Sequence, residues 1–99
     1  MKKPKQVESE YHRNYHLKRR YGITVEEYDE LLEAQGHRCK ICRTDDPGGR
    51  NARFHVDHCH TTNKVRGLLC SRCNQAIGLF DESVLVLESA IKYLNEKSN

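Results

Sequence analysis

The segment from Val56 to Asn74 holds most of the side chains in this chain that could do chemistry. It reads V-D-H-C-H-T-T-N-K-V-R-G-L-L-C-S-R-C-N, and so combines one aspartate, two histidines and three cysteines with a closing asparagine. Thiolates are soft ligands suited to Zn²⁺, whereas carboxylate and amide oxygens are hard ligands suited to Mg²⁺ or Mn²⁺. The segment therefore offers ligands for two different kinds of metal site.

Two C-x-x-C pairs predict a structural zinc site. The pairs are Cys39 with Cys42 and Cys70 with Cys73, and 27 residues separate them. A gap of two residues lets both sulfurs of a pair reach one ion, and four thiolates complete a tetrahedron without an open position for catalysis. The binding energy of such an ion becomes folding energy, about 10 kcal/mol in small zinc peptides.

Disulfide bonds are the alternative use of these cysteines, and the sequence disfavours them. The chain begins K-K-P-K-Q without an apolar leader, so we expect it in the reducing cytoplasm, where thiols persist. Pairing would also leave one of the five cysteines over. Cys59 stands outside both C-x-x-C pairs, and we expect a packed or idle thiol there rather than a fifth ligand.

The aspartate, the histidines and the final asparagine need a role of their own, because four cysteines already saturate a zinc ion. Asp57 and Asn74 provide hard oxygen ligands for Mg²⁺ or Mn²⁺. A neutral imidazole, whose reference pKa is about 6.5, suits a general base that takes a proton from water, and His58 is the candidate for this role. Consecutive strand residues point to opposite faces, so a site shared by Asp57 and His58 requires a bulge or a strand end at that point.

Such a set of groups is sufficient for phosphodiester hydrolysis, since a metal ion neutralises the phosphate and stabilises the leaving 3′ oxygen. The alternative is a surface turn in which His58 and His60 have no chemical role, within a zinc-dependent nucleic-acid-binding module that does not catalyse. The spacing by itself leaves both open.

The elements around these residues indicate a small α+β fold with two N-terminal helices, a two-stranded ribbon and a C-terminal helix. Thr24 and Glu27 fit a capping box, and Gly36 suits a helix C-terminus. We divide the chain into a basic tail and helix (1–20), a metal-bound core (21–80) and a last helix (81–99). The expected elements are a mobile tail at 1–7, helices at 8–20 and 25–35, a loop at 43–53, strands at 54–57 and 65–69, a short helix at 74–80 interrupted by Gly78, and a helix at 83–95.

The composition favours a small domain that is stabilised by a bound metal ion and that binds a polyanionic partner. Only 36% of the 99 residues are hydrophobic and none is Trp, so the core is lean. No apolar run approaches the length of a membrane helix. Residues 1–20 carry seven Lys and Arg against two Glu. We expect DNA phosphates to contact Lys18, Arg19 and Arg20 without reading sequence. Arg66 and Arg72 are further candidates, the alternative being solvated surface.

The motifs D-H-C-H and V-R-G-L-L-C-S-R-C-N, with the upstream C-K-I-C, closely resemble the recombination endonuclease VII family of phages and bacteria. That family belongs to the HNH, or His-Me finger, nucleases, which have a ββα-metal core. The stretch R-R-Y-G-I-T-V-E-E-Y-D-E-L-L-E-A-Q-G-H-R-C is similar to the family's helix before the first C-x-x-C pair, or zinc knuckle. The resemblance covers roughly residues 18–80. It implies zinc on the four cysteines, a catalytic divalent ion on Asp57 and Asn74, His58 as general base, and a scissile-phosphate contact by His60.

The activity that the resemblance implies is metal-dependent DNA cleavage that leaves 5′-phosphate and 3′-hydroxyl ends. The resemblance also implies a phage or prophage origin and action in the bacterial host cytoplasm. The reaction would be nicking or double-strand cleavage of DNA, with other phage DNA-processing proteins as candidate partners. Ile77 stands where family members can carry a further acidic metal contact. The chain ends at Asn99, without the long region used for dimerisation by the junction-resolving phage enzyme. We therefore expect nicking or non-specific cleavage, with a dimeric Holliday-junction resolvase as the alternative; monomer and homodimer both stay open.

Overall fold

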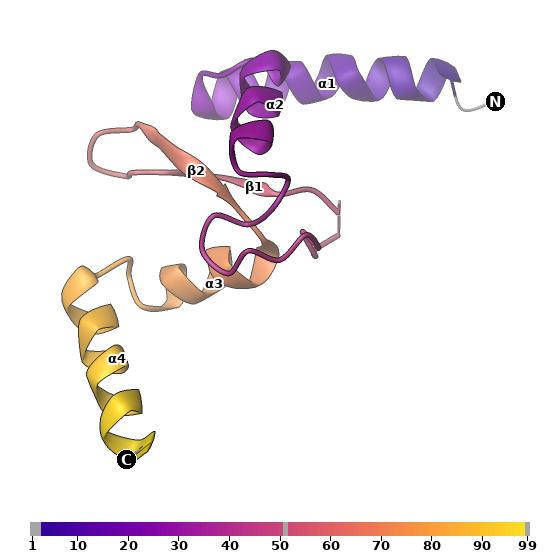
Figure 1. The fold of residues 1–99 in the computed structure, drawn as a ribbon. Helices are drawn as coiled ribbons and strands as arrows, with labels where there is room; N and C mark the ends of the chain where they lie inside the picture. Colours follow the sequence, from indigo (N-terminus) through magenta and orange to yellow (C-terminus); the bar gives the residue numbers. More distant parts are fainter. Residues whose placement is uncertain (1–2, 51, 99) are drawn as a thin grey trace.

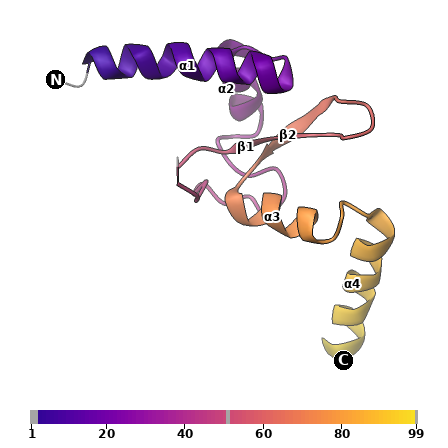
Figure 2. The ribbon, with the colours of Figure 1, turned by 180° about the vertical axis from the view of Figure 1, so that it is seen from behind.

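The computed structural model describes residues 3–50 and 52–98. Over these residues the chain is a small α+β fold with four helices and one two-stranded sheet (Figure 1). In order, the elements are α1 (Lys3–Tyr21), α2 (Val25–Ala34), β1 (His55–His58), β2 (Val65–Leu69), α3 (Ser71–Leu79) and α4 (Val84–Ser98). Helices α1 and α2 lie on one side of the hairpin and α3 on the other, as the view from behind also shows (Figure 2).

Helix α1 begins at Lys3, so the prediction of a mobile tail over residues 1–7 was wrong for the described residues 3–7; residues 1 and 2 lie outside the described range. Lys, Gln and Glu have high helix propensity, and Pro4 is tolerated in a first turn because its missing N–H would be unpaired there. The helix ends at Tyr21 and is followed by Gly22, whose φ of 73° suits glycine and whose N–H donates to the Lys18 carbonyl at 3.0 Å.

Both predicted signals at the ends of α2 are confirmed. Thr24 Oγ1 accepts from the Glu27 N–H at 3.0 Å, and Glu27 Oε1 accepts from the Thr24 N–H at 2.8 Å. This reciprocal pair is a capping box. At the other end Gly36 has a φ of 70°, and the His37 N–H donates to the Leu32 carbonyl at 2.8 Å. Local sequence therefore sets both ends of this helix.

The hairpin contains the irregularity that a site at Asp57 and His58 requires. Strands β1 and β2 are antiparallel, with Asp57 opposite Gly67 but His58 opposite Val65. Arg66 is thus an extra residue on β2, which makes a bulge at the point where β1 ends. The expected strand at 65–69 is confirmed, and β1 lies one residue later than expected.

The core lies between the hairpin and the helices and includes two of the knuckle cysteines. Its buried members are Leu17, Tyr28, Cys39, Phe54, Val56, Leu68, Leu69 and Cys70. The buried amide of Gln35 pairs with the outer edge of β2: its Oε1 accepts from the Leu68 N–H at 2.9 Å and its Nε2 donates to the Leu68 carbonyl at 3.0 Å. This side chain joins the end of α2 to the sheet as a further strand would.

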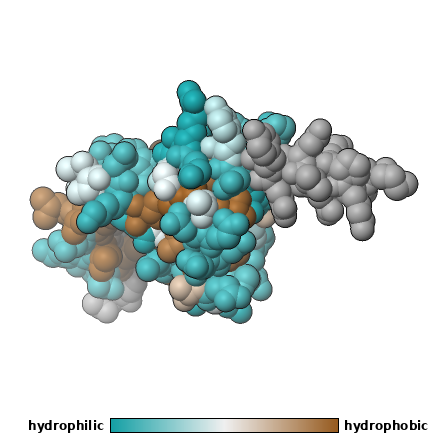
Figure 3. All heavy atoms as spheres, turned by 90° about the horizontal axis from the view of Figure 1, so that it is seen from above, coloured by the Kyte–Doolittle hydropathy of each residue, from teal (hydrophilic) through white to brown (hydrophobic). Residues whose placement is uncertain are grey.

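Helix α4 projects from the remainder of the fold, and much of its apolar surface is exposed. Val84, Leu85 and Ile91 are 66%, 76% and 59% exposed. In Figure 3, seen from above, apolar surface appears at the left, the side from which α4 extends in Figure 1. Within the described residues, none of the helices combines the length and the apolar character needed to cross a membrane.

Replacing Tyr28 by Phe should destabilise the zinc-loaded protein by about 1–3 kcal/mol. The Tyr28 hydroxyl donates a buried hydrogen bond of 2.6 Å to the Phe54 carbonyl, and its removal leaves that carbonyl unpaired. Urea unfolding followed by circular dichroism measures the change. Tyr93→Phe is the matched control, because Tyr93 is 59% exposed on α4. Equal stabilities of the two variants would show that the hydrogen bond contributes nothing.

Candidate metal centre and adjoining polar cluster

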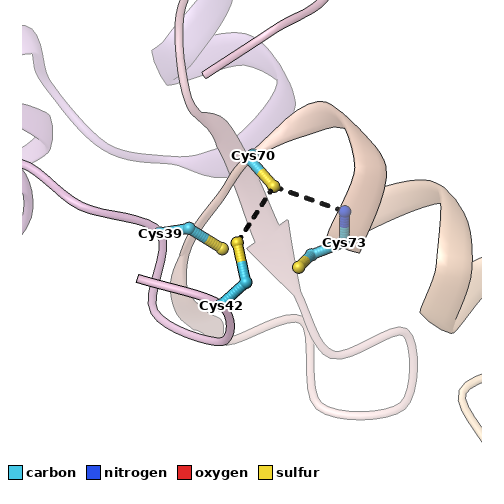
Figure 4. A group of neighbouring side chains, drawn as sticks. All are labelled: Cys39, Cys42, Cys70 and Cys73. Carbon is cyan, nitrogen blue, oxygen red and sulfur yellow. Dashed lines mark hydrogen bonds between the residues drawn. The ribbon is translucent and has the colours of Figure 1, made fainter. Parts of the chain in front are cut away.

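Four cysteine side chains converge between the first knuckle and the start of α3 (Figure 4). The sulfur atoms of Cys39, Cys42, Cys70 and Cys73 all lie within 4.8 Å of one another. Cys42 Sγ and Cys70 Sγ are 3.7 Å apart. A tetrahedron with Zn–S bonds of about 2.3 Å has S···S edges of about 3.8 Å, so the cluster has the size and the donor chemistry of a zinc site.

Each C-x-x-C pair is shaped by backbone hydrogen bonds around its first cysteine. In the first knuckle the Ile41 N–H donates to Cys39 Sγ at 3.4 Å, and the Arg43 N–H donates to the Cys39 carbonyl at 3.1 Å. In the second, Cys70 is the N-cap of α3, and its sulfur accepts from the Cys73 N–H at 3.5 Å.

The prediction that α3 starts after the second knuckle was therefore wrong. The helix begins at Ser71 and continues through Gly78 to Leu79, because the Cys70 sulfur accepts the N–H bond that a serine or aspartate cap would accept. Cys73 and Asn74 consequently lie in the first turn of a helix rather than before it. That placement puts Asn74 in the helix directly after the last cysteine of the cluster.

The thiols of the cluster differ in their readiness to ionise. Burial opposes the ionisation of Cys39, but hydrogen bonds from the backbone at Cys70, Cys42 and Ile41 outweigh it and lower its pKa to about 6. Burial, together with hydrogen bonds to the neighbouring thiols, raises the pKa of Cys73 to about 12. Four thiolates can coexist at this density only beside a cation, and a divalent ion bound there would supply that charge.

A second cluster surrounds the end of β1 and the bulge. The guanidinium of Arg66 binds Asp57 through two bonds, Nε to Oδ2 at 2.7 Å and Nη2 to Oδ1 at 3.0 Å. The same Nη2 donates to Glu82 Oε1 at 2.8 Å, and Glu82 Oε2 lies 3.2 Å from His60 Nε2. The structure thus connects Asp57 to His60 through Arg66 and Glu82.

The ring of His58 lies at the edge of this cluster. Its centroid is 4.9 Å from that of His60 and 5.5 Å from that of Tyr21, and both pairs are inclined rather than stacked. Arg66 Nη2 also donates to the His58 carbonyl at 3.3 Å. The structure therefore brings three of the sequence-predicted site residues together at the hairpin: Asp57, His58 and His60. Asn74 lies on α3, which contacts both strands.

The carboxylates of Asp57 and Glu82 share one cation, the guanidinium of Arg66. Hydrogen bonding to Arg66 lowers the pKa of Glu82, and the Arg66 pKa is raised by hydrogen bonds to Asp57 first and Glu82 second. Beside the cluster is an open cavity of about 570 Å³. Its lining residues are Cys59, His60, Thr61, Arg66, Gly78, Asp81 and Glu82.

Tyr21 and Glu82 are residues of this region that the sequence reasoning missed. Tyr21 ends α1 and Glu82 lies in the connection between α3 and α4, outside every motif. Arg66, predicted to contact phosphate, is instead engaged by carboxylates in this structure. The remaining predicted phosphate contacts are exposed: Arg72 on α3, and Lys18, Arg19 and Arg20 in the last turn of α1.

The family model of recombination endonuclease VII matches residues 14–96, which include every residue of both clusters. The chain belongs to the recombination endonuclease VII family. Two curated relatives are both called Gene 59 protein. The one from Mycobacterium phage D29 is 47% identical over 77 residues, covering 77% of this chain and 46% of the relative. The one from Mycobacterium phage L5 is 44% identical over 75 residues, covering 75% and 44%. The chain spans less than half the length of these relatives.

Ile77 occupies the position three residues after Asn74, where the resemblance implies that a further acidic metal contact can stand. Ile77 packs partly buried against the core, so no carboxylate reaches the site from that turn of α3. The acidic side chain in the cluster comes from Glu82, in the connection after the helix.

Proposed function

We propose that the protein is a metal-dependent DNA endonuclease of the HNH, or His-Me finger, type. The observation that carries the proposal is the order β1–bulge–β2–α3, in which Asp57 and His58 lie at the bulge and the zinc cluster fixes the start of the helix that bears Asn74. The family match over most of the chain supports it. In this proposal β1, β2 and α3 form the ββα-metal core.

Two sets of donors would hold two kinds of ion. The four cysteines suit structural Zn²⁺, and the carboxylate of Asp57 with the amide oxygen of Asn74 suits catalytic Mg²⁺ or Mn²⁺. When bound, that second ion would neutralise the phosphate and the leaving 3′ oxygen. Hard oxygen donors fit it, although Asp57 must share its carboxylate with Arg66 or release the guanidinium.

The remaining steps belong to the chain's own side chains. His58 would accept the proton of the attacking water as general base, with Tyr21 against its ring to limit its rotation. His60 would contact or orient the scissile phosphate from the rim of the cavity. The exposed cations at the end of α1 and on α3, namely Lys18, Arg19, Arg20 and Arg72, would bind DNA phosphates, and Arg66 would join them once released from Asp57. Products would have 5′-phosphate and 3′-hydroxyl ends.

The setting of this reaction is the cytoplasm of a bacterial host, with phage DNA-processing proteins as possible neighbours. A dimeric Holliday-junction resolvase is the second candidate, and the exposed apolar side chains of α4 favour it, because they could bury against a second subunit. Cleavage of branched DNA at the same rate as linear duplex would exclude it.

The test is incubation of the zinc-loaded protein with supercoiled plasmid and a panel of Mg²⁺, Mn²⁺ and Ca²⁺. We expect nicked or linear DNA with Mg²⁺ or Mn²⁺, and no cleavage after chelation of the added ion. Binding of the plasmid without cleavage under every ion would favour the alternative of a non-catalytic zinc-dependent nucleic-acid-binding module.

A further inference from the structure

Arg66 is held between two carboxylates in a way that a regular hairpin would not produce. It is the extra residue of the bulge, without an opposite partner on β1, and a bulge redirects the side chain that it carries. Its guanidinium occupies both oxygens of Asp57 and one oxygen of Glu82. The Arg66 guanidinium is therefore shared between Asp57, the proposed metal ligand, and Glu82, an acid outside the metal-binding motif.

The backbone around Glu82 is held in an unusual conformation. Asp81 and Glu82 both have a φ of 55°, in the left-handed region that glutamate rarely adopts. The Glu82 N–H donates to the Ile77 carbonyl at 2.7 Å, and the Asp81 N–H donates to the Gly78 carbonyl at 2.9 Å. Strained positions of this kind gather at functional sites, and this one aims the Glu82 carboxylate at both Arg66 and His60.

A divalent cation on Asp57 and the guanidinium of Arg66 would repel each other. Glu82 gives the guanidinium a second anionic partner, so that it can leave Asp57 without losing all its charge pairing. We propose that Glu82 is a positioning residue of the nuclease site, which draws Arg66 off Asp57 when a divalent cation binds there and keeps the guanidinium at the cavity beside His60. This inference rests on the proposed function, and it adds a residue that acts through Arg66.

The experiment measures Mn²⁺ binding to the zinc-loaded protein by electron paramagnetic resonance of the free ion, without DNA. Asp57→Asn is the blank that lacks the site. Glu82→Gln, which removes the charge and keeps the shape, should raise the Kd for Mn²⁺ by about fivefold or more. Arg66→Met alone should lower the Kd, because it removes the competing cation.

Two controls distinguish the positioning of Arg66 by Glu82 from a general effect of negative charge near the cavity. Asp81→Asn removes the neighbouring charge at the same cavity, and asparagine tolerates its positive φ, so the Kd should stay within about twofold of wild type. In an Arg66→Met background, Glu82→Gln should also change the Kd by less than about twofold. If Glu82→Gln lowers zinc content, Glu82→Asp takes its place; it keeps the charge but shortens the reach to Arg66, and should still weaken Mn²⁺ binding.

Each outcome decides the matter. A Glu82→Gln effect equal to that of Asp81→Asn, or one that persists without Arg66, overturns the inference in favour of bulk charge or direct ligation. If the wild type cleaves plasmid while Glu82→Gln binds Mn²⁺ normally, the inference fails and the proposed function stands. If the Arg66-dependent effect appears but the wild type cleaves no DNA, the proposed function fails instead. Mn²⁺ binding equal in wild type and Asp57→Asn overturns both.

Discussion

Replacing Cys70 by serine is expected to abolish zinc binding and to unfold the domain. Cys70 is 2% exposed, contributes its sulfur to the four-cysteine cluster, and caps α3. Loss of a zinc site forfeits about 10 kcal/mol in small zinc domains. Because the total stability of a domain is about 5–15 kcal/mol, little would remain.

Zinc content by atomic emission and thermal unfolding by circular dichroism measure this effect. Wild type should contain zinc and unfold cooperatively, whereas Cys70→Ser should contain none and show no transition. Cys59→Ser is the matched control, because Cys59 lies outside the cluster and should keep both zinc and fold. A Cys70→Ser protein that folds cooperatively without zinc would contradict the structural assignment.

The second large effect is expected from His58→Ala, which should lower the cleavage rate by about 10²–10⁴-fold while the fold and the zinc content survive. His58 lies partly buried at the end of β1, where its ring contacts Tyr21 and His60 but belongs to no core cluster. Its loss should therefore remove the proposed base without opening a cavity in the core.

The rate is measured as the loss of supercoiled plasmid at saturating Mg²⁺ or Mn²⁺. His55→Ala is the control, since His55 lies on the same strand and is exposed, and it should cut at nearly the wild-type rate. Asp57→Ala should also abolish cleavage, but through loss of an ion ligand. His58→Ala keeps that ligand, so excess metal should not restore its cleavage activity. Equal activity of His58→Ala and His55→Ala would remove His58 from the proposed role.

The sequence alone predicted those features that depend on short stretches of chain. The two C-x-x-C pairs predicted the convergence of four cysteines, because a gap of two residues already lets both sulfurs of a pair reach one position. Thr24 and Glu27 predicted the start of α2, because the hydrogen bonds of a capping box form within four residues of sequence. A site shared by Asp57 and His58 would require a bulge or a strand end at that point, and the structure has a register shift between these two residues.

Only the tertiary structure decided which charges meet around that site. Arg66 was expected on phosphate, yet its partners Asp57 and Glu82 lie 9 and 16 residues away and belong to other elements. Tyr21, at the end of α1, contacts the ring of His58 although the two residues lie 37 positions apart in the sequence, and no motif contains Glu82. Ligand spacing and helix caps are local, whereas an ion pair between distant elements depends on how the whole chain packs. The sequence thus determined which residues could do chemistry, and packing determined which of them share one cation.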